Sequence, residues 1–115
     1  MRKETREWVQ KAEDDYVASV DLRNGPDRLH DQVCFHCQQS AEKYLKALLE
    51  EASQPIPKIH DLGALLRLVL PFHPLLGPLK RGLVMLKNYA VVTRYPGTNA
   101  TKRQAAAAQI GRAHV

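Results

Sequence analysis

The clearest pattern of apolar and polar positions runs through residues 28–52 and centres on Phe35–Leu49. That central stretch has no glycine, proline or β-branched residue, a composition that favours an α-helix. One side of the helix carries the apolar stripe: His30, Cys34, Cys37, Ala41, Tyr44, Leu45, Leu48 and Ala52. The other side carries Gln39, Lys43, Lys46 and Glu50. The pattern predicts an amphipathic helix on which the other apolar segments pack.

The segments on either side also show helical spacing. Residues 3–22 predict a first helix, with Asp15 at the edge of its apolar face, which comprises Trp8, Val9, Ala12, Tyr16 and Val20. Residues 24–27, Asn-Gly-Pro-Asp, end that helix. Asp61 is the predicted N-cap of a third, shorter helix, whose predicted buried face comprises Leu62, Leu65, Leu66 and Val69.

Three prolines at positions 71, 74 and 78 mark a loop and the start of a fourth helix over residues 79–92. Its apolar face comprises Leu79, Leu83, Leu86 and Ala90. Residues 95–99 predict a turn, and a fifth helix follows from about Thr101 through residues 105–108. No segment alternates with a period of two. The sequence therefore predicts an all-α fold, an antiparallel up-and-down bundle of about five helices in one domain over residues 1–115.

Composition limits the classes of protein to consider. The chain has 115 residues, 44% apolar and 25% charged, which is ordinary for a globular domain with a single core. It has no apolar run of about 18 residues, and its charged N-terminal segment lacks the apolar region of a signal peptide. With only two cysteines, a reducing, cytoplasmic location is expected. The formal net charge of +5 permits an anionic partner such as a nucleotide or RNA.

Cys34, His36 and Cys37, with His30 on the cysteine face, suggest metal ligands. That face is the apolar one, however, and reduced cysteine is a common small core residue. No second cysteine pair completes a zinc site. We therefore expect no metal and no cofactor.

Three groups of polar residues are candidates for binding chemistry. Arg94 and Tyr95, before Pro96, place a guanidinium and an aromatic ring at a helix end, where arginine suits phosphate or carboxylate. The alternative is a charge that interacts with the helix dipole. His60 is a candidate general base or nucleotide contact, or a packing residue at a helix start. Gln39, Lys43 and Lys46 either face a phosphate or partner, or form a solvated helix back.

Four landmarks, taken in order, resemble the HEPN family, the higher-eukaryote and prokaryote nucleotide-binding domain. They are a W-x-x-x-A-x-x-D signature at residues 8–15, Q-Q-S-A-E-K-Y-L-K-A-L at 38–48, K-I-H-D-L at 58–62 and R-Y-P at 94–96. The resemblance implies a five-helix bundle that forms homodimers. It also implies a minimal nucleotidyltransferase as the partner, in a two-component or toxin–antitoxin pair.

A second branch of that family comprises metal-independent ribonucleases with the pattern R-x(4–6)-H. Here the positions that follow Arg94 at that spacing are Asn99, Ala100 and Thr101, so the histidine is missing. The resemblance therefore favours a nucleotide-binding accessory protein over an enzyme. Its expected site comprises Arg94, Tyr95, His60, Asp15, Gln39 and Lys43. The alternatives are a ribonuclease toxin that uses Arg94 and His60, and a purely structural dimerisation module.

Overall fold

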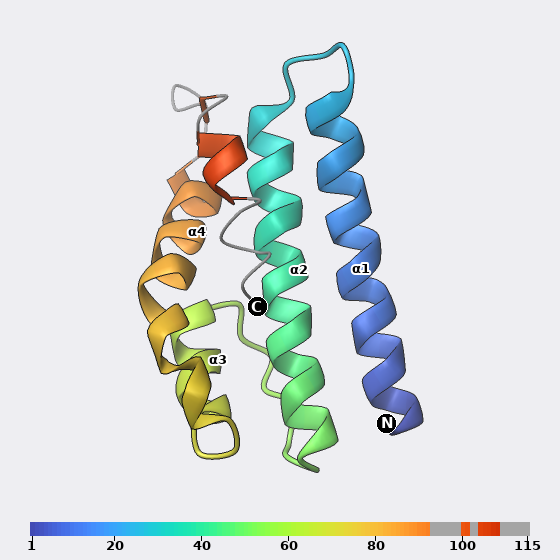
Figure 1. The fold of residues 1–115 in the computed structure, drawn as a ribbon, viewed down its shortest axis with the longest axis vertical. Helices are drawn as coiled ribbons and strands as arrows, with labels where there is room; N and C mark the ends of the chain where they lie inside the picture. The colour runs from blue at the N-terminus through green and yellow to red at the C-terminus, as the bar shows by residue number, and fades with distance from the viewer. Residues whose placement is uncertain (93–99, 102–103, 109–115) are drawn as a thin grey trace.

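A computed structural model describes residues 1–92, 100–101 and 104–108 of the chain (Figure 1). Its first two helices, α1 (Lys3–Asn24) and α2 (His30–Glu51), form an antiparallel hairpin. The bend between them falls at the predicted Asn-Gly-Pro-Asp breaker. None of the helices in these described ranges combines the length and apolar character needed to cross a membrane.

The open end of the hairpin is closed by Arg2. Its guanidinium donates to the Glu50 carbonyl at 2.9 Å and to Ser53 Oγ at 2.7 Å, and its backbone N–H donates to the Glu51 carboxylate at 3.1 Å. A cation at the end of a helix complements the partial negative charge of its free carbonyls. Arg2 therefore fastens the start of α1 to the end of α2.

Small residues line the seam between α1 and α2. The residues of α1 that are fully buried are Thr5, Ala12 and Ser19, one heptad apart. Ser40 Oγ donates to the Ala12 carbonyl at 2.8 Å. In the same antiparallel alignment, Thr5 is opposite Ala47 and Ser19 is opposite Val33. The large residues of the predicted α1 face are only partly buried. Small residues allow the two backbones to approach closely.

The connector after α2 departs from a simple up-and-down path. Residues 52–61 run back along α2, where the Gln38 side chain donates to the His60 carbonyl at 3.1 Å. Helix α3 (Leu62–Val69) therefore starts beside the middle of α2 and runs parallel to it, so the antiparallel prediction is wrong for this helix (Figure 1). Asp61 caps it as predicted, accepting from the Ala64 N–H at 3.1 Å.

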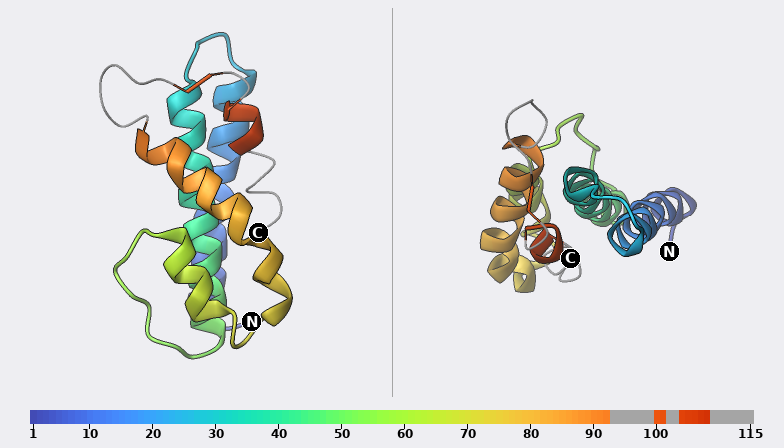
Figure 2. Two further views of the ribbon diagram at one scale, coloured as in Figure 1. Left: turned by 90° about the vertical axis from the view of Figure 1, so that its left-hand side faces the viewer. Right: turned by 90° about the horizontal axis from the view of Figure 1, so that it is seen from above.

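Residues 74–92 continue the bundle on the side of α2 opposite α1. The proline-rich segment forms a 3-10 helix, η1 (Pro74–Leu79), which leads into α4 (Lys80–Val92). Helix α4 runs back up the bundle and crosses α2 at an angle (Figure 2). Residues 104–108 are helical, and Thr101 and Gln104 form a capping box in which each side chain accepts from the other's backbone N–H, at 3.0 and 2.9 Å. This agrees with the predicted start of a fifth helix near Thr101.

Helix α2 lies between two layers, α1 on one side and α3 with α4 on the other (Figures 1 and 2). The core includes the predicted apolar residues Cys34, Cys37, Ala41 and Leu45, each 0% exposed. All four predicted residues of α3 are buried, as are Leu83 and Leu86 of α4. Because α2 is covered on both sides, even its polar residues Gln38, Glu42 and Lys46 are at most 5% exposed.

Candidate functional site

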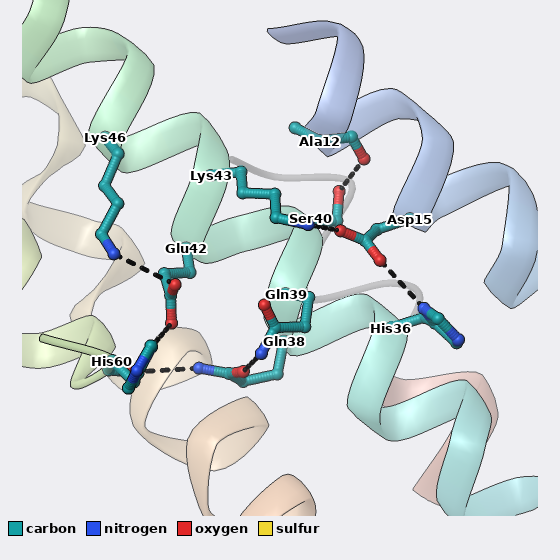
Figure 3. Close-up of polar contacts among 10 residues, drawn as sticks. All are labelled: Ala12, Asp15, His36, Gln38, Gln39, Ser40, Glu42, Lys43, Lys46 and His60. Carbon is teal, nitrogen blue, oxygen red and sulfur yellow. Dashed lines mark hydrogen bonds and ion pairs between the residues drawn. The ribbon is translucent and has the colours of Figure 1, made fainter. Parts of the chain in front are cut away.

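Two clusters of polar side chains flank α2 (Figure 3). One joins α2 to α1, and the other joins α2 to the connector just before α3. Both draw on the Q-Q-S-A-E-K stretch at residues 38–43, which lies in the middle of α2. The helix presents successive residues of this stretch to different sides, so one short sequence supplies both clusters.

Asp15 of α1 is the centre of the first cluster. Its carboxylate accepts hydrogen bonds from Lys43 Nζ and from His36 Nδ1, the latter at 2.9 Å. Asp15 is 12% exposed, whereas the side chains of Lys43 and His36 are 24% and 30% exposed. A carboxylate that leaves water needs charged or hydrogen-bonding partners, and α2 supplies two of them. The cluster is thus a partly solvated cross-link between the helices.

Glu42 is the centre of the second cluster and is more deeply buried, with 4% of its side chain exposed. One carboxylate oxygen accepts from Lys46 Nζ at 3.2 Å, and the other lies 2.9 Å from His60 Nδ1. The Lys46 ammonium also lies 5.8 Å from the centre of the Trp8 ring, a cation–π contact. Buried charges of opposite sign that share hydrogen bonds offset much of each other's desolvation cost.

His60 combines a fixed orientation with solvent access. Its side chain is 71% exposed, yet Nδ1 contacts the buried Glu42 carboxylate. Because an ionised carboxylate can only accept, Nδ1 carries the hydrogen, and in the neutral ring Nε2 is left as an acceptor. The Gln38 bond to the His60 carbonyl holds the backbone at the same point.

The neighbouring Asp61 side chain has two roles. It caps α3, and its other carboxylate oxygen accepts from Lys87 Nζ of α4 at 2.9 Å. The bond from Lys87, with the backbone bond from Ala64, lowers the pKa of the Asp61 carboxyl below its ordinary value. Asp61 thereby links the start of α3 to α4.

The two cysteines lie in the core and are free thiols. Burial is the main reason that the pKa of Cys34 rises to about 12, with contributions from Cys37 and Asp31. A thiol with such a pKa stays protonated at neutral pH and is a poor metal ligand or nucleophile. Within the described residues, no group of three or more His, Cys, Asp or Glu side chains has the geometry to hold a metal ion.

The structure brings together some of the predicted site residues. Asp15 and Lys43 form an ion pair. Gln39 instead donates to Gln38 Oε1 through a long contact of 3.4 Å, and Gln38 belongs to the second cluster. His60 lies with Glu42 in the separate second cluster. Arg94 and Tyr95 fall outside the described residues.

One sequence interpretation is wrong. The side of α2 that carries Lys43 and Lys46 is not a solvated face, because Lys46 is buried in an ion pair with Glu42 and Lys43 forms an ion pair with Asp15 of α1. Sequence reasoning also missed Gln38 and Glu42 as contact residues. Their spacing held a signal, since Gln38, Glu42 and Lys46 recur every four residues and so form one polar stripe.

Comparison with protein families gives a match to the model described as HEPN domain, over residues 5–114. The chain belongs to the HEPN domain family. Comparisons with curated proteins and with solved structures gave no match. HEPN domains are nucleotide-binding or ribonuclease-type domains, and the all-helical fold of the described residues agrees with this membership. The contacts around residues 38–43 show how this HEPN chain uses its most recognisable stretch, to hold three segments of the bundle together.

Proposed function

We propose that this chain is a non-catalytic HEPN domain that binds the phosphate of a nucleotide or RNA around Arg94. In this proposal it forms a homodimer and serves a nucleotidyltransferase partner in the cytoplasm, in a two-component or toxin–antitoxin-type system. Family membership supports nucleotide binding. The landmark strings at residues 38–48, 58–62 and 94–96 resemble those of the nucleotidyltransferase-associated branch.

The observation that carries the non-catalytic part is the sequence after Arg94. Residues 99–101 are Asn-Ala-Thr, so no histidine stands four to six positions after the arginine. Hydrolysis of RNA through its 2′-hydroxyl needs a group that takes up a proton, and an imidazole is the usual one. Without that histidine, a guanidinium can still hold phosphate by paired hydrogen bonds.

The described contacts support a binding role for some of the other residues. Lys43 is 24% exposed and uses one of its three N–H donors on Asp15, so the others remain for an anion. Asp15 in turn holds the Lys43 ammonium in place. In this proposal Tyr95 stacks on a base, and Arg94 supplies the main phosphate contact.

Calorimetric titration with ATP tests nucleotide binding. We expect binding at millimolar concentration or tighter, and a loss of about tenfold or more in Arg94→Ala, equivalent to about 1.4 kcal/mol. Arg28→Ala, in the exposed loop between α1 and α2, is the matched control and should bind as the wild type does. If wild type binds no ATP at millimolar concentration, the chain is better described as a structural dimerisation module.

The accessory role needs a separate test. A tagged copy purified from its native host should recover a small nucleotidyltransferase in near-stoichiometric amount. Recovery of the protein alone, or with RNA only, would count against the partnership. Sedimentation of the purified chain tests the homodimer independently.

A second candidate, a ribonuclease, is favoured by one specific observation. The buried Glu42 orients His60 and leaves Nε2 accessible, an arrangement that suits a general base. Cleavage of RNA by the pure protein, abolished in both His60→Ala and Arg94→Ala, would support it. Absence of cleavage that depends on Arg94 would rule it out.

A further inference from the structure

The charges of this chain are divided sharply between its two halves. All 12 acidic residues lie at or before Asp61, together with nine of the 17 lysines and arginines. Residues 62–115 carry the other eight cations and no acidic residue at all. The first 61 residues therefore have a formal charge of −3 and the remainder +8. Such asymmetry between halves points to an interaction with an anionic partner.

Four of the eight cations after Asp61 fall within the described residues, and these four lie in one layer of the fold. Helix α3, η1 and α4 lie together on the side of α2 opposite α1 (Figures 1 and 2). Arg67, Lys80 and Arg81 are exposed on this layer, and none has a carboxylate within ion-pair distance among the described residues. Lys87 of the same layer is paired, but with Asp61, which precedes α3.

The same layer exposes large apolar side chains. The exposed fraction is 92% for Leu75 of η1, and 40–45% for Leu68, Phe72, Val84 and Met85. Beside α3, a groove of about 270 Å³ is lined by Leu49, Gln54, Pro55, Pro57 and Leu68. Leu68 directly follows Arg67 on α3, and Val84 and Met85 stand three and four positions after Arg81, the spacing of neighbours on one face of a helix. Exposed apolar side chains that neighbour cations in this way suit an interaction surface.

The start of α4 is unfavourable for the isolated chain. Lys80 and Arg81 occupy its first turn, and no acidic residue is there. Cations at the positive end of a helix dipole cost stability, and an anionic partner would reverse that cost. Residues that reduce the stability of the free protein are expected where a surface serves binding.

We propose that the α3–η1–α4 layer binds an acidic amphipathic helix of a partner protein. Glutamates or aspartates of that helix pair with Arg67, Lys80 and Arg81, while its apolar face covers Leu68 and Leu75. Of the five exposed apolar side chains named above, one, Phe72, is aromatic, and this composition favours a protein over RNA, whose bases stack on aromatic rings. A second copy is disfavoured, because a two-fold interface would bring the same cations face to face. This inference does not depend on nucleotide binding around Arg94.

The test uses a fluorescein-labelled peptide of 18 residues, with leucines at i, i+3, i+4 and i+7 spacing and glutamates on the other face. A second peptide has lysine at every glutamate position. Fluorescence anisotropy should show the acidic peptide binding at least about tenfold more tightly than the basic one. Equal affinity for the two peptides, or no binding of the acidic peptide, would overturn the proposal.

Matched variants locate the surface. The pair Lys80→Glu and Arg81→Glu should weaken acidic-peptide binding about tenfold, and it adds acids where the helix dipole favours them. The control pair, Lys3→Glu and Lys11→Glu, makes the same charge change on exposed positions of α1 and should alter affinity less than about twofold. Leu75→Ser should also weaken binding, because that side chain is almost wholly exposed. If the two double variants lose the same affinity for the acidic peptide, binding is not specific to the α3–η1–α4 layer and the proposal is refuted.

The competing occupants are tested with the same variants. Sedimentation with vesicles containing phosphatidylserine, anisotropy with labelled polyuridine, and light scattering of the chain alone probe a membrane, RNA and a second copy. If any of these binds more tightly than the acidic peptide, and the Lys80→Glu and Arg81→Glu double variant loses that binding, the proposal is overturned. Far-UV circular dichroism confirms that each variant is folded. A failed ATP titration would leave this result unaffected.

Discussion

The Glu42–Lys46 pair allows the cost of a buried ion pair to be measured within one helix. The Lys46 ammonium lies 3.2 Å from Glu42, and their side chains are 7% and 4% exposed. At that separation the gross attraction is about 5 kcal/mol for an effective dielectric constant of about 20. Removing one partner leaves the other charge buried, which typically costs about 3–5 kcal/mol. That is a large share of the roughly 5–15 kcal/mol that stabilises a domain.

We therefore expect Lys46→Met to destabilise the protein by about 3–5 kcal/mol, because methionine keeps the apolar stem but leaves Glu42 with His60 alone. Glu42→Gln should cost a similar amount. The double variant removes both charges and should lie within about 1.5 kcal/mol of wild type, since neutral replacements of buried pairs are often tolerated. The two effects should thus be strongly non-additive.

Urea unfolding measures these differences, followed by circular dichroism and by fluorescence of the single tryptophan, Trp8, which lies beside Lys46. The urea midpoint of each single variant should fall by about 2 M or more. Lys43→Met is the control, because its pair with Asp15 is more exposed, and it should cost about 1 kcal/mol. If the loss of unfolding free energy in the double variant equals the sum of the two single losses within about 0.5 kcal/mol, the two residues are not coupled and the reasoning fails.

Three further expectations follow from burial and pKa. Leu45→Asp should unfold the protein at neutral pH, seen as loss of the helical circular dichroism signal, because Leu45 is 0% exposed; Leu75→Asp, at 92% exposed, should leave it folded. The pKa of Asp61 is lowered in the folded state, so its stabilisation is present above about pH 4 and is lost as the pH falls through the folded value. Asp61→Asn should flatten that acid limb of a stability–pH curve, whereas an unchanged limb would contradict the role of Lys87. The pKa of Cys34 is raised to about 12 in the folded state. The contribution of this buried thiol to folding stability is therefore fully present below about pH 8.5 and is lost as the pH rises toward 12. Cys34→Ala should reduce the alkaline loss of stability, and native wild type should resist alkylation by iodoacetamide at pH 7.

Local signals predicted helix positions well. The N-cap Asp61 and the four buried residues of α3 are where the sequence indicated, and a helix starts near Thr101 as predicted. These features depend on neighbours within a few residues, so the sequence contains them directly. The direction of α3 is different, because it depends on how far residues 52–61 run back along α2, and no local pattern specifies that path.

The candidate site was predicted less completely, for a related reason. The sequence indicates both Asp15 and Lys43 as site residues, but not their pairing, because the two residues are 28 positions apart and lie on different helices. Lys46 was placed on a solvated face because a helical wheel shows only one helix. Once a central helix is covered on two sides, its polar residues must find partners inside the protein. Arg94 and Tyr95 remain predictions.

The small residues between α1 and α2 allow more than one alignment of the two helices, so packing alone does not specify which one forms. Thr5, Ala12 and Ser19 recur every seven residues, as do Val33, Ser40 and Ala47 opposite them. Sliding one helix by a heptad, about 10.5 Å, would again set small residues against small residues. The Asp15 contacts with Lys43 and His36, and the Arg2 contacts with the end of α2, form in only one of these alignments. Those polar contacts therefore specify one alignment of the hairpin among those that the small residues allow, whatever their net contribution to stability.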